Sequence, residues 1–562
     1  MSRSTSPTAF FFHADAIEGD GRDLVGRRSA GQSFLRGYLD HAADNPVRVL
    51  AQKKRDIETF QTVARNLGSQ SDIDGLTLRG RDDFTRFGTI FFPGPGYLDA
   101  AWRRQHLDVT ACSLVGITHT VSTKRVMDSL FHLMLQPIKP WDALICTSRA
   151  VQSVVQTQLD QQVDYIKAHF GASRVTVPQL PVIPLGIHAA DFAHDPDARA
   201  TLRDTYGATE DTVVVMSMGR LTVVEKANPI PLFMALEEIA QATGKDIQFW
   251  LVGWASTPDE HQLHVDGAAA FCPSVTVHII DGRDADIRRT IWSGADIFTL
   301  PVDNIQETFG LVPVEAMAAG LPVVMPDWDG FRDTVVDGET GFLIPTMMAL
   351  ASGIGRDIAR RFANGTDGYL QYLMMIEQQT VIDMRAYVTA LTALILNPDL
   401  RQRMGQAGVR HVRSNLDWTN VVPRYQELAD ELAQMRGAAG ADAAGTRSTN
   451  PTEIDPFALY ASYPTQSAQP TVTVTHRKPL TAEALHLLDS LNGRHLYRRR
   501  LLPDAQTLRI AELVAQAGTT DAAQVAQKAG VSLPATLGTL LFLAKYDFLT
   551  IDGLEQNNAR IG

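Results

Sequence analysis

The chain has 562 residues, of which 45% are apolar and 20% charged, and its formal net charge at pH 7 is −12. This length exceeds what one hydrophobic core supports, so about two to four domains of ordinary globular composition are expected. The acidic balance disfavours nucleic acid as the main partner. No apolar run reaches the length of about eighteen residues that a membrane span requires, and Phe10–Phe12 is too short for the apolar region of a signal peptide.

Three cysteines, Cys112, Cys146 and Cys272, lie far apart, each within an apolar run. This distribution indicates buried thiols in a reducing compartment, without disulfides and without a zinc site. A cytoplasmic location is therefore expected.

Short runs of apolar, β-forming residues alternate along the chain with segments of helical periodicity. The strands expected in the first half are Ala9–His13, Val47–Ala51, Thr89–Pro93, Cys112–Ile117, Ala143–Thr147 and Val182–Leu185. Those expected in the second half are Thr212–Met218, Ile247–Val252, Val275–Ile280, Asp296–Leu300, Val323–Met325 and Gly341–Ile344. The helices expected between them include Gln32–Ala43, Ile57–Leu67, Ala150–His169, Leu232–Ala242, Ile287–Ser293 and Val312–Ala319.

Strands that are apolar throughout and alternate with helices are typical of parallel sheets covered on both faces. The pattern occurs twice, on either side of a polar, turn-like stretch at 190–201. We therefore expect an α/β chain with two doubly wound, Rossmann-like domains, over residues 1–195 and 196–415. Because such domains bind ligands at the carboxyl ends of their strands, the site is expected in the crevice between them.

The rest of the chain changes character twice. Helical patterns run throughout residues 347–435. Ala, Gly, Ser, Thr and Pro then dominate, with few aliphatic residues, so a flexible linker is expected over 437–470.

A small, mainly helical module is expected over 471–562. Its expected elements are helices at Thr481–Leu491, Leu508–Gln516, Ala522–Ala529 and Pro534–Lys545 and a strand at Phe548–Ile551. This order is that of a winged-helix or helix-turn-helix fold with its turn at 530–532.

The helix of this module that would read DNA carries Lys545 as its one cation, which disfavours nucleic acid. Arg494 and Arg498–Arg500 form a basic cluster that is expected either to be a solvated face or to bind an acidic partner or a phosphate. A protein partner, self-association or docking of an acceptor through 471–562 is the favoured role.

The most informative segment runs over 307–324 and begins Glu-Thr-Phe-Gly-Leu-Val-Pro-Val-Glu. An apolar strand that ends at Leu300 leads into a loop, and a helix is expected to begin near Leu311. Pro313 lies in the first turn of that helix, where the missing N–H costs nothing.

Charges and amides of this segment are arranged to bind an anionic sugar derivative. The amides of Phe309, Gly310 and Leu311 are expected to point out of the helix N-terminus, which is a ready anion site. Glu307 precedes the helix and Glu315 lies within it, eight residues later. One carboxylate can then reach the hydroxyls of a sugar while the other reaches a ribose of the same ligand.

These motifs resemble those of the family 4 retaining glycosyltransferases, which have the GT-B fold and two glutamates separated by seven residues. The resemblance covers roughly residues 85–430. Gly219-Arg220-Leu221, followed by Lys226, is similar to the family segment whose cations neutralise the donor diphosphate, a role that needs no metal. Ile117-Thr-His119-Thr is similar to the family's histidine motif, which implies that His119 contacts the transferred sugar.

Other segments follow the family's order. Ile183–Ile187, Asp337–Leu343 and 398–418 are similar to its domain crossover, its turn after the donor-domain helices and its terminal helices. The resemblance implies that residues 1–195 bind the acceptor, that 196–415 bind a nucleoside-diphosphate sugar, and that a helix at 416–436 crosses back to the first domain.

Acceptor binding is predicted from position alone. The family often has two adjacent glycines in its first strand–helix loop, where this chain has only Gly31. Gly94 and Gly96 are expected at a strand end that faces the crevice. The acceptor is left open between a saccharide, a lipid carrier, a small molecule and a protein.

No metal ion and no cofactor are predicted. Asp284–Asp286 and Asp327–Asp329 look like the Asp-x-Asp motif of metal-dependent transferases of another fold. Asp284 is instead expected to cap a helix, and the two cations near the diphosphate already take the usual role of a metal.

The sequence thus predicts a retaining, metal-independent transferase that moves a sugar from a nucleoside diphosphate to an acceptor hydroxyl, with Glu307, His119, Arg220 and Lys226 as catalytic residues. Two alternatives stay open. One is a nucleotide-sugar epimerase, and the other is a non-catalytic regulatory protein that acts through the C-terminal module.

Overall fold

The computed structural model describes residues 6–13, 26–42, 46–79, 82–439, 450–491 and 502–556. The chain forms two compact units that divide between Ser448 and Thr449, and each is described by itself. In the part of the chain that the structure describes, no helix combines the length and apolarity needed to cross a membrane.

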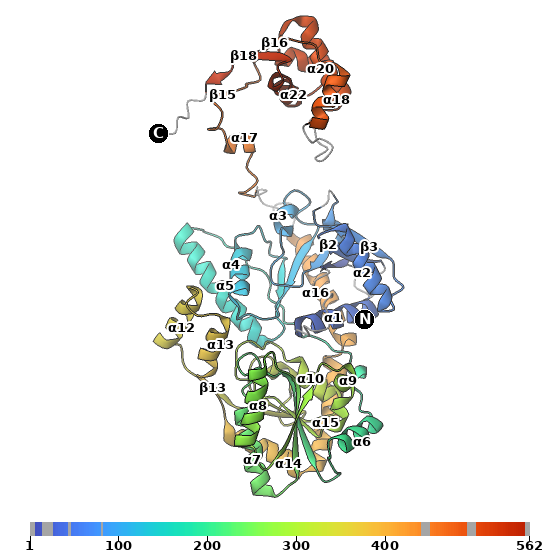
Figure 1. Ribbon diagram of the computed structural model, residues 1–562, viewed down its shortest axis with the longest axis vertical. Coiled ribbons are helices and arrows are strands. Elements are labelled where there is room, and N and C mark those ends of the chain that lie inside the picture. The colour runs from blue at the N-terminus through green and yellow to red at the C-terminus, as the bar shows by residue number, and fades with distance from the viewer. Residues whose placement is uncertain are drawn as a thin grey trace. The chain divides into compact units, whose positions relative to one another are not determined.

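The first unit contains two parallel six-stranded sheets, each in its own domain (Figure 1). The sheet of the first domain has the order β3-β2-β1-β4-β5-β6. Its strands are β1 (Thr8–Phe12), β2 (Val47–Ala51), β3 (Ile73–Thr77), β4 (Thr89–Phe91), β5 (Ser113–Ile117) and β6 (Ala143–Ile145). Its helices are α1 (Gly26–His41), α2 (Lys54–Asn66), α3 (Ala100–Arg104), α4 (Lys124–Met134) and α5 (Arg149–Phe170), with a 3-10 turn η2 (Phe84–Phe87).

Side chains of each strand alternate between the two faces of this sheet, and each face has its own core. On β1, Phe10 and Phe12 belong to one core and Ala9 and Phe11 to the other. The Phe10 and Phe12 face is covered by α1, α2 and α16 (Trp418–Ala439), the last helix of the unit. The opposite face is covered by α3, α4 and α5.

The second sheet repeats this topology, with the order β12-β11-β10-β7-β8-β9. Its strands are β7 (Val213–Arg220), β8 (Ile247–Trp254), β9 (Thr276–Asp281), β10 (Ile297–Thr299), β11 (Val323–Pro326) and β12 (Gly341–Ile344). Its helices are η3 (Ala189–Phe192), α6 (Pro196–Thr205), α7 (Ile230–Thr243), α8 (Pro258–Phe271), α9 (Ala285–Gly294), α10 (Leu311–Ala318), α11 (Phe331–Thr334), α14 (Met384–Leu396) and α15 (Pro398–Asn415). Met216 and Trp250 pack in the core on one face, and Val215 and Phe249 in the core on the other.

The structure differs from the expected strands and helices in three places. Val182–Leu185 is no strand, because its contact with the sheet is a single bridge between Val182 and Cys146. The edge strand β3 was not expected, because Asp74 and Gly75 break the apolar pattern in its half-buried run. Residues 347–435 are not helical throughout, since β13 (Thr346–Met348) pairs antiparallel with β14 (Thr380–Ile382).

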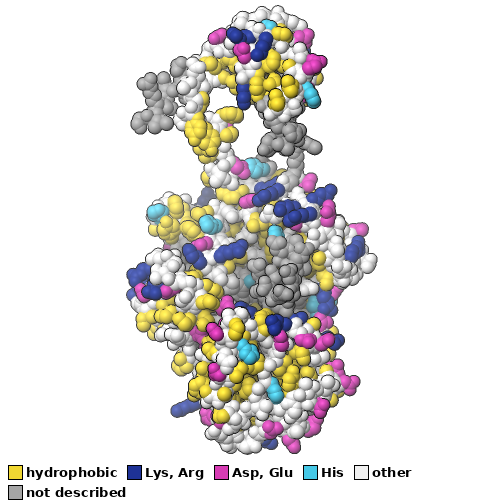
Figure 2. Space-filling view, viewed as in Figure 1, with side chains coloured by type: hydrophobic (Ala, Val, Ile, Leu, Met, Phe, Trp, Pro, Cys, Tyr) yellow, Lys and Arg dark blue, Asp and Glu magenta, His cyan; other side chains and the backbone are white. Residues whose placement is uncertain are grey.

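The β13–β14 ribbon carries a helical excursion made of α12 (Gly353–Ala363) and α13 (Tyr369–Glu377). Its inner side is held by buried Ile358, Phe362 and Leu373. Its outer side exposes a group of large apolar residues, which are Met347, Met348, Leu350, Ile354, Leu370 and Val381. Figure 2 shows hydrophobic side chains gathered where Figure 1 places this excursion.

The chain passes between the two domains twice, and the two crossings lie side by side. Ile187 on the first crossing pairs with Asp417 on the second, and the amide of Trp418 donates to the carbonyl of Ile187 at 3.1 Å. The Trp418 ring fills space that Gly37 and Gly186 leave open, because a Cβ at either glycine would lie 2.4 or 2.6 Å from the nearest ring atom.

The second unit has a three-stranded antiparallel sheet with β16 (Thr473–His476) between β17 (Thr519–Asp521) and β18 (Leu549–Asp552). Helices α18 (Ala482–Leu491), α20 (Asp504–Ala517), α21 (Ala522–Ala529) and α22 (Leu533–Lys545) agree with the expected helices. Strands β16 and β17 are too short and polar to have been expected. The basic cluster at Arg494 and Arg498–Arg500 lies outside the described residues.

The segment that was expected to be a linker contains local structure. Helix α16 extends to Ala439, three residues into it. Helix α17 (Pro456–Leu459) follows at the start of the second unit and buries none of its residues. Strand β15 (Gln466–Ser467) pairs with β19 (Glu555–Gln556).

Candidate active site

A lysine–glutamate pair lies at the carboxyl ends of β7 and β10. The Lys226 ammonium is 3.0 Å from Glu307 Oε2, and the two side chains are 19% and 21% exposed. Arg220, the last residue of β7, pairs with Glu225 at 3.1 Å. The structure therefore brings Arg220, Lys226 and Glu307 to the same strand ends, where the sequence predicts a donor-binding site.

Glycines make room for this arrangement. A Cβ on Gly219 would lie 2.8 Å from Lys226 Cε, so the absence of a side chain lets the lysine stem pass over the end of β7. A Cβ on Gly253, at the end of β8, would lie 1.8 Å from the carbonyl oxygen of Gly219. Gly310 has a φ of +81° and packs against Phe331, which fixes the turn into α10.

The amides at the start of α10 are used differently from the expectation. The amides of Thr308 and Gly310 each donate to Glu307 Oε1 at 3.2 Å. The carboxylate of Glu307 thus accepts from the amides of Phe309 and Gly310, two of the three amides that were expected to face a phosphate, whereas that of Leu311 stays a prediction. The reason is local: Glu307 is close enough to fold back onto the residues that follow it.

The two glutamates have opposite electrostatic surroundings. Burial alone would raise the pKa of Glu307, but the ammonium of Lys226 and the backbone N–H groups hold it below its ordinary value. Burial raises the pKa of Glu315 to about 7, against a smaller lowering by Lys226. Glu307 is therefore a fixed anion, whereas the charge of Glu315 depends on pH near neutrality.

The first domain touches the Glu307 loop directly. The hydroxyl of Thr308 donates to the backbone carbonyl of His119, which follows β5. The hydroxyl of Ser148, which caps α5, donates to the backbone carbonyl of Thr308 at 2.9 Å. These two contacts place the loops of Glu307 and His119 against each other.

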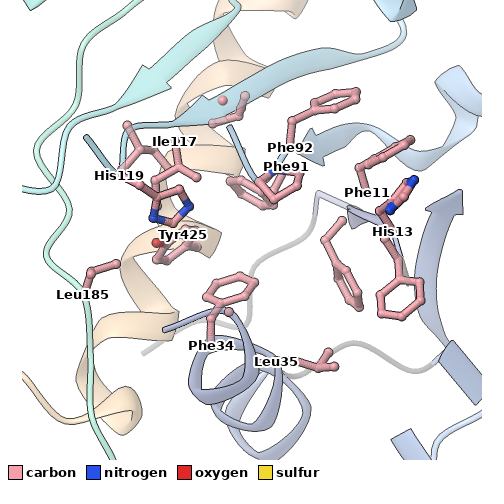
Figure 3. Close-up of a pocket in the computed structure, with 17 residues that line it drawn as sticks. Phe11, His13, Phe34, Leu35, Phe91, Phe92, Ile117, His119, Leu185 and Tyr425 are labelled. Carbon is pink, nitrogen blue, oxygen red and sulfur yellow. The ribbon is translucent and has the colours of Figure 1, made fainter. Parts of the chain in front are cut away.

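The three glycines predicted on the acceptor side are not brought together. Gly31 and His119 line one cavity of about 110 Å³ in the first domain (Figure 3). Gly96 lines a separate hollow with Arg125 and His132 on α4. The carbonyl of Gly94 accepts a hydrogen bond from the amide of Ile117 at 3.1 Å, so this glycine belongs to the end of the sheet.

Several polar residues near the site were not foreseen. Asp303, on the loop after β10, and Glu377, on α13, are buried, and each has a carboxyl oxygen without a hydrogen-bond partner. Burial, and then the charge of the neighbouring Glu377, raise the pKa of Asp303 to about 8. Burial raises the pKa of Glu377 to about 7.

Two further residues connect the site to its surroundings. Burial, and then the charge of Glu307, raise the pKa of Asp329 well above its usual value. Tyr369 on α13 hydrogen-bonds through its hydroxyl with Ser122, in the loop after His119, at 2.8 Å. Neither contact could be predicted from the sequence, because the partners are far apart along the chain.

Of the two Asp-x-Asp pairs, the first has the structural role that was expected. Asp284 caps α9 and accepts from the amide of Asp286 at 2.8 Å, which confirms the capping prediction. Asp327 forms an ion pair with Arg332 at 2.8 Å. Within the described ranges, no group of three or more His, Cys, Asp or Glu side chains is close enough together to hold a metal ion.

Parts of the chain are similar in sequence to known proteins. A family model described as "Glycosyl transferases group 1" matches residues 212–359, which carry Arg220, Lys226, Glu307 and Glu315. A phosphatidyl-myo-inositol mannosyltransferase of Mycobacterium leprae is 27% identical over 331 residues, which are 58% of this chain and 69% of that protein. A GDP-mannose-dependent alpha-(1-6)-phosphatidylinositol monomannoside mannosyltransferase of Mycolicibacterium smegmatis is 27% identical over 281 residues, which are 49% of this chain and 62% of that protein.

A solved structure is also similar. The crystal structure of Anabaena HepE in complex with UDP has 15% sequence identity and a TM-score of 0.49, and the match covers 75% of this chain and 98% of that one. The fold itself is established by the two six-stranded parallel sheets of the same topology. Residues 212–359 are thus similar to the glycosyl transferases of group 1, and the two parallel six-stranded sheets give the first unit the GT-B fold.

Proposed function

We propose that the chain transfers a sugar from a nucleoside-diphosphate donor to an acceptor hydroxyl, with retention of the anomeric configuration and without a metal ion. The observation that carries this proposal is the Lys226–Glu307 pair on a loop that touches the His119 loop of the other domain. The pair supplies a cation and an acceptor of hydroxyl hydrogen bonds, and the loop of Glu307 contacts the backbone of His119.

In this proposal the second domain binds the donor. Arg220 and Lys226 neutralise the diphosphate, Glu307 accepts hydrogen bonds from sugar hydroxyls, and Glu315 accepts them from the ribose. Phosphate oxygens that approach Lys226 compete with Glu307 for its ammonium, and the backbone amides of Thr308 and Gly310 keep Glu307 in place meanwhile. Fixed charges of this kind act more strongly in a crevice that excludes water.

For the proposed retention we exclude a covalent intermediate, because the described residues of this loop offer no suitable carboxylate nucleophile. Glu307 is neutralised by Lys226, and the raised pKa of Asp329 makes that group a poor nucleophile. We therefore assign front-face substitution. The bond from the anomeric carbon to the phosphate oxygen breaks, with its electron pair leaving on the diphosphate. The acceptor oxygen bonds to the same face, and its proton passes to the departing phosphate oxygen.

The test is donor binding followed by turnover. Thermal shift and hydrolysis are measured with UDP-, GDP-, ADP- and TDP-sugars, including GDP-mannose because one relative is named for it. Each measurement is made with and without EDTA on the wild type, on Glu307→Ala and on the exposed control Glu238→Ala. We expect stabilisation by one nucleotide class, lost in Glu307→Ala, kept in the control and unaffected by EDTA.

Three results would count against the proposal. No stabilisation by any donor would argue against a nucleotide-sugar site, and loss of activity with EDTA would argue against metal independence. Conversion of the donor to a new nucleotide sugar in the absence of an acceptor would identify an epimerase. The anomeric configuration of the product, read from proton NMR coupling, decides retention.

A further inference from the structure

The cavity that Gly31 and His119 share is apolar and rich in aromatic residues. It lies at the carboxyl ends of β1, β4 and β5, with α1 and α16 closing its sides (Figure 3). Its floor is made of buried residues that include Phe12, Phe91 and Phe92. Its rim is formed by exposed or half-buried residues that include His13 and His119, so the cavity opens toward the crevice.

One buried polar group lies within this apolar lining. Tyr425, on α16, is 2% exposed, and its hydroxyl has no hydrogen-bond partner. Figure 3 shows this hydroxyl on the same side of the cavity as His119. A buried hydroxyl without a partner is destabilising, and such groups in native proteins call for an explanation such as a ligand.

The lining also restricts what can bind. The described residues of the lining include no Lys or Arg, so no permanent cation among them neutralises a phosphate or carboxylate. A sugar ring would lose the hydration of several hydroxyls here and find one hydroxyl, that of Tyr425, in the floor. An apolar group that carries one hydrogen-bonding atom can fill the apolar floor and pair with the hydroxyl of Tyr425.

We propose that this cavity binds an apolar group of the acceptor, next to the hydroxyl that receives the sugar. The proposal rests on the proposed function, because it takes the crevice as the place of transfer. His119 stands at the rim, and its carbonyl is bonded to Thr308, the neighbour of Glu307. A hydroxyl attached to a group in the cavity therefore extends toward the donor.

The volume sets the size of this group. A cavity of about 150 Å³ lined by apolar side chains binds benzene, and this one measures about 110 Å³. It therefore fits a branched alkyl group of about four or five carbons, or the greater part of one aromatic ring whose remaining atoms extend through the open rim. Each buried methylene increases affinity about fourfold, so a group of four carbons discriminates about 250-fold against an acceptor that lacks it.

The test uses toluene and p-cresol, which differ by one hydroxyl, as probes of the full chain in ligand-observed NMR titrations. The wild type is expected to bind both, with p-cresol at least fivefold tighter because it pairs with Tyr425. Tyr425→Phe is expected to bind the two probes equally. Leu185→Trp and Ile117→Phe, which enlarge half-buried rim residues, are expected to weaken both probes tenfold or more.

Controls keep the result interpretable. Tyr165→Phe changes a tyrosine on α5 that is 48% exposed and is expected to alter neither titration. Thermal unfolding by circular dichroism verifies that each variant is folded. The inference is overturned if the wild type shows no saturable binding of toluene, or if both folded rim variants bind like the wild type. The role of the hydroxyl is overturned if Tyr425→Phe keeps the preference for p-cresol.

The donor experiments separate the two proposals. Probe binding without any donor binding leaves the cavity in place and removes the proposed function. Donor binding and hydrolysis without probe binding remove the apolar acceptor group and leave the transferase.

Discussion

We predict that protonation of Glu315 weakens donor binding, a prediction that can be tested without knowing the acceptor. Its carboxyl lies on α10, half-buried, with a pKa raised to about 7 by burial. A carboxylate that accepts ribose hydroxyls binds as the anion, so donor affinity is present above this pKa and is lost as the pH falls through it. Glu307 stays ionised over the same range because its pKa is lowered.

The size of the effect follows from two limits. At pH 5.5 a group with this pKa is about 3% ionised, which would weaken binding about 30-fold if only the anion bound. A neutral carboxyl still accepts a hydrogen bond, and hydrogen bonds to charged groups exceed neutral ones by about 1–1.5 kcal/mol. We therefore expect the donor Kd to rise about tenfold from pH 8 to pH 5.5.

The assay is calorimetric titration of an intact nucleoside-diphosphate sugar at half-unit steps from pH 5.5 to pH 8.5. A donor sugar is used because a free nucleoside diphosphate has its own terminal phosphate titration in this range. Glu315→Gln is expected to give a flat profile near the acid limit of the wild type. A flat wild-type profile, or a variant that keeps the full slope, would refute the reasoning.

Other predictions concern charge, burial and backbone clearance. Lys226→Met is expected to lower kcat/KM for the donor about 100- to 1000-fold, as removal of a preorganised charge does; steady-state rates within threefold of the wild type would contradict it. The pKa of Glu377 is higher in the folded state than in the unfolded state, because burial disfavours the ionised carboxyl. The contribution of Glu377 to the free energy of unfolding is therefore most favourable at acid pH and is lost as the pH rises through about 7. Glu377→Gln should therefore gain up to about 3 kcal/mol at pH 8 and almost nothing near pH 4.5 in urea unfolding; equal gains at both would contradict it. Gly253→Ala brings a Cβ to 1.8 Å from the carbonyl of Gly219 and should cost about 1–3 kcal/mol. A Cβ at Gly355 would meet nothing within 4 Å, so Gly355→Ala should not destabilise the fold. Equal melting temperatures for the two variants would show that the clearance at Gly253 is not required.

The periodic parts of the fold could be predicted from sequence because their signal is local. The apolar strands of both sheets, such as β7 and β8, differ from their surroundings over enough residues to be found. β3 could not be found, since an edge strand that buries no residue fully tolerates Asp74 and Gly75. β13 and β14 have three residues each, too few for a period to appear.

The site was predictable as a set of positions and not as a set of interactions. The motif around Glu307 located the loop, because a strand end, glycine and helix start are sequence features. The sequence does not reveal that Glu307 turns its own carboxylate onto the amides of Thr308 and Gly310, since that depends on a side-chain rotamer. The proximity of Asp303 and Glu377 depends on where a helical excursion packs, which no local pattern encodes.

The paired crossings near Trp418 limit how the first unit can move. The bridge between Ile187 and Asp417 joins the two connecting segments. The Trp418 indole packs directly against Gly37 and Gly186, where there is no room for a side chain. We therefore expect the two domains to rotate relative to each other about the line along which the crossings run. Such a rotation would separate Thr308 from the His119 carbonyl and, in the proposed function, would admit donor and acceptor together.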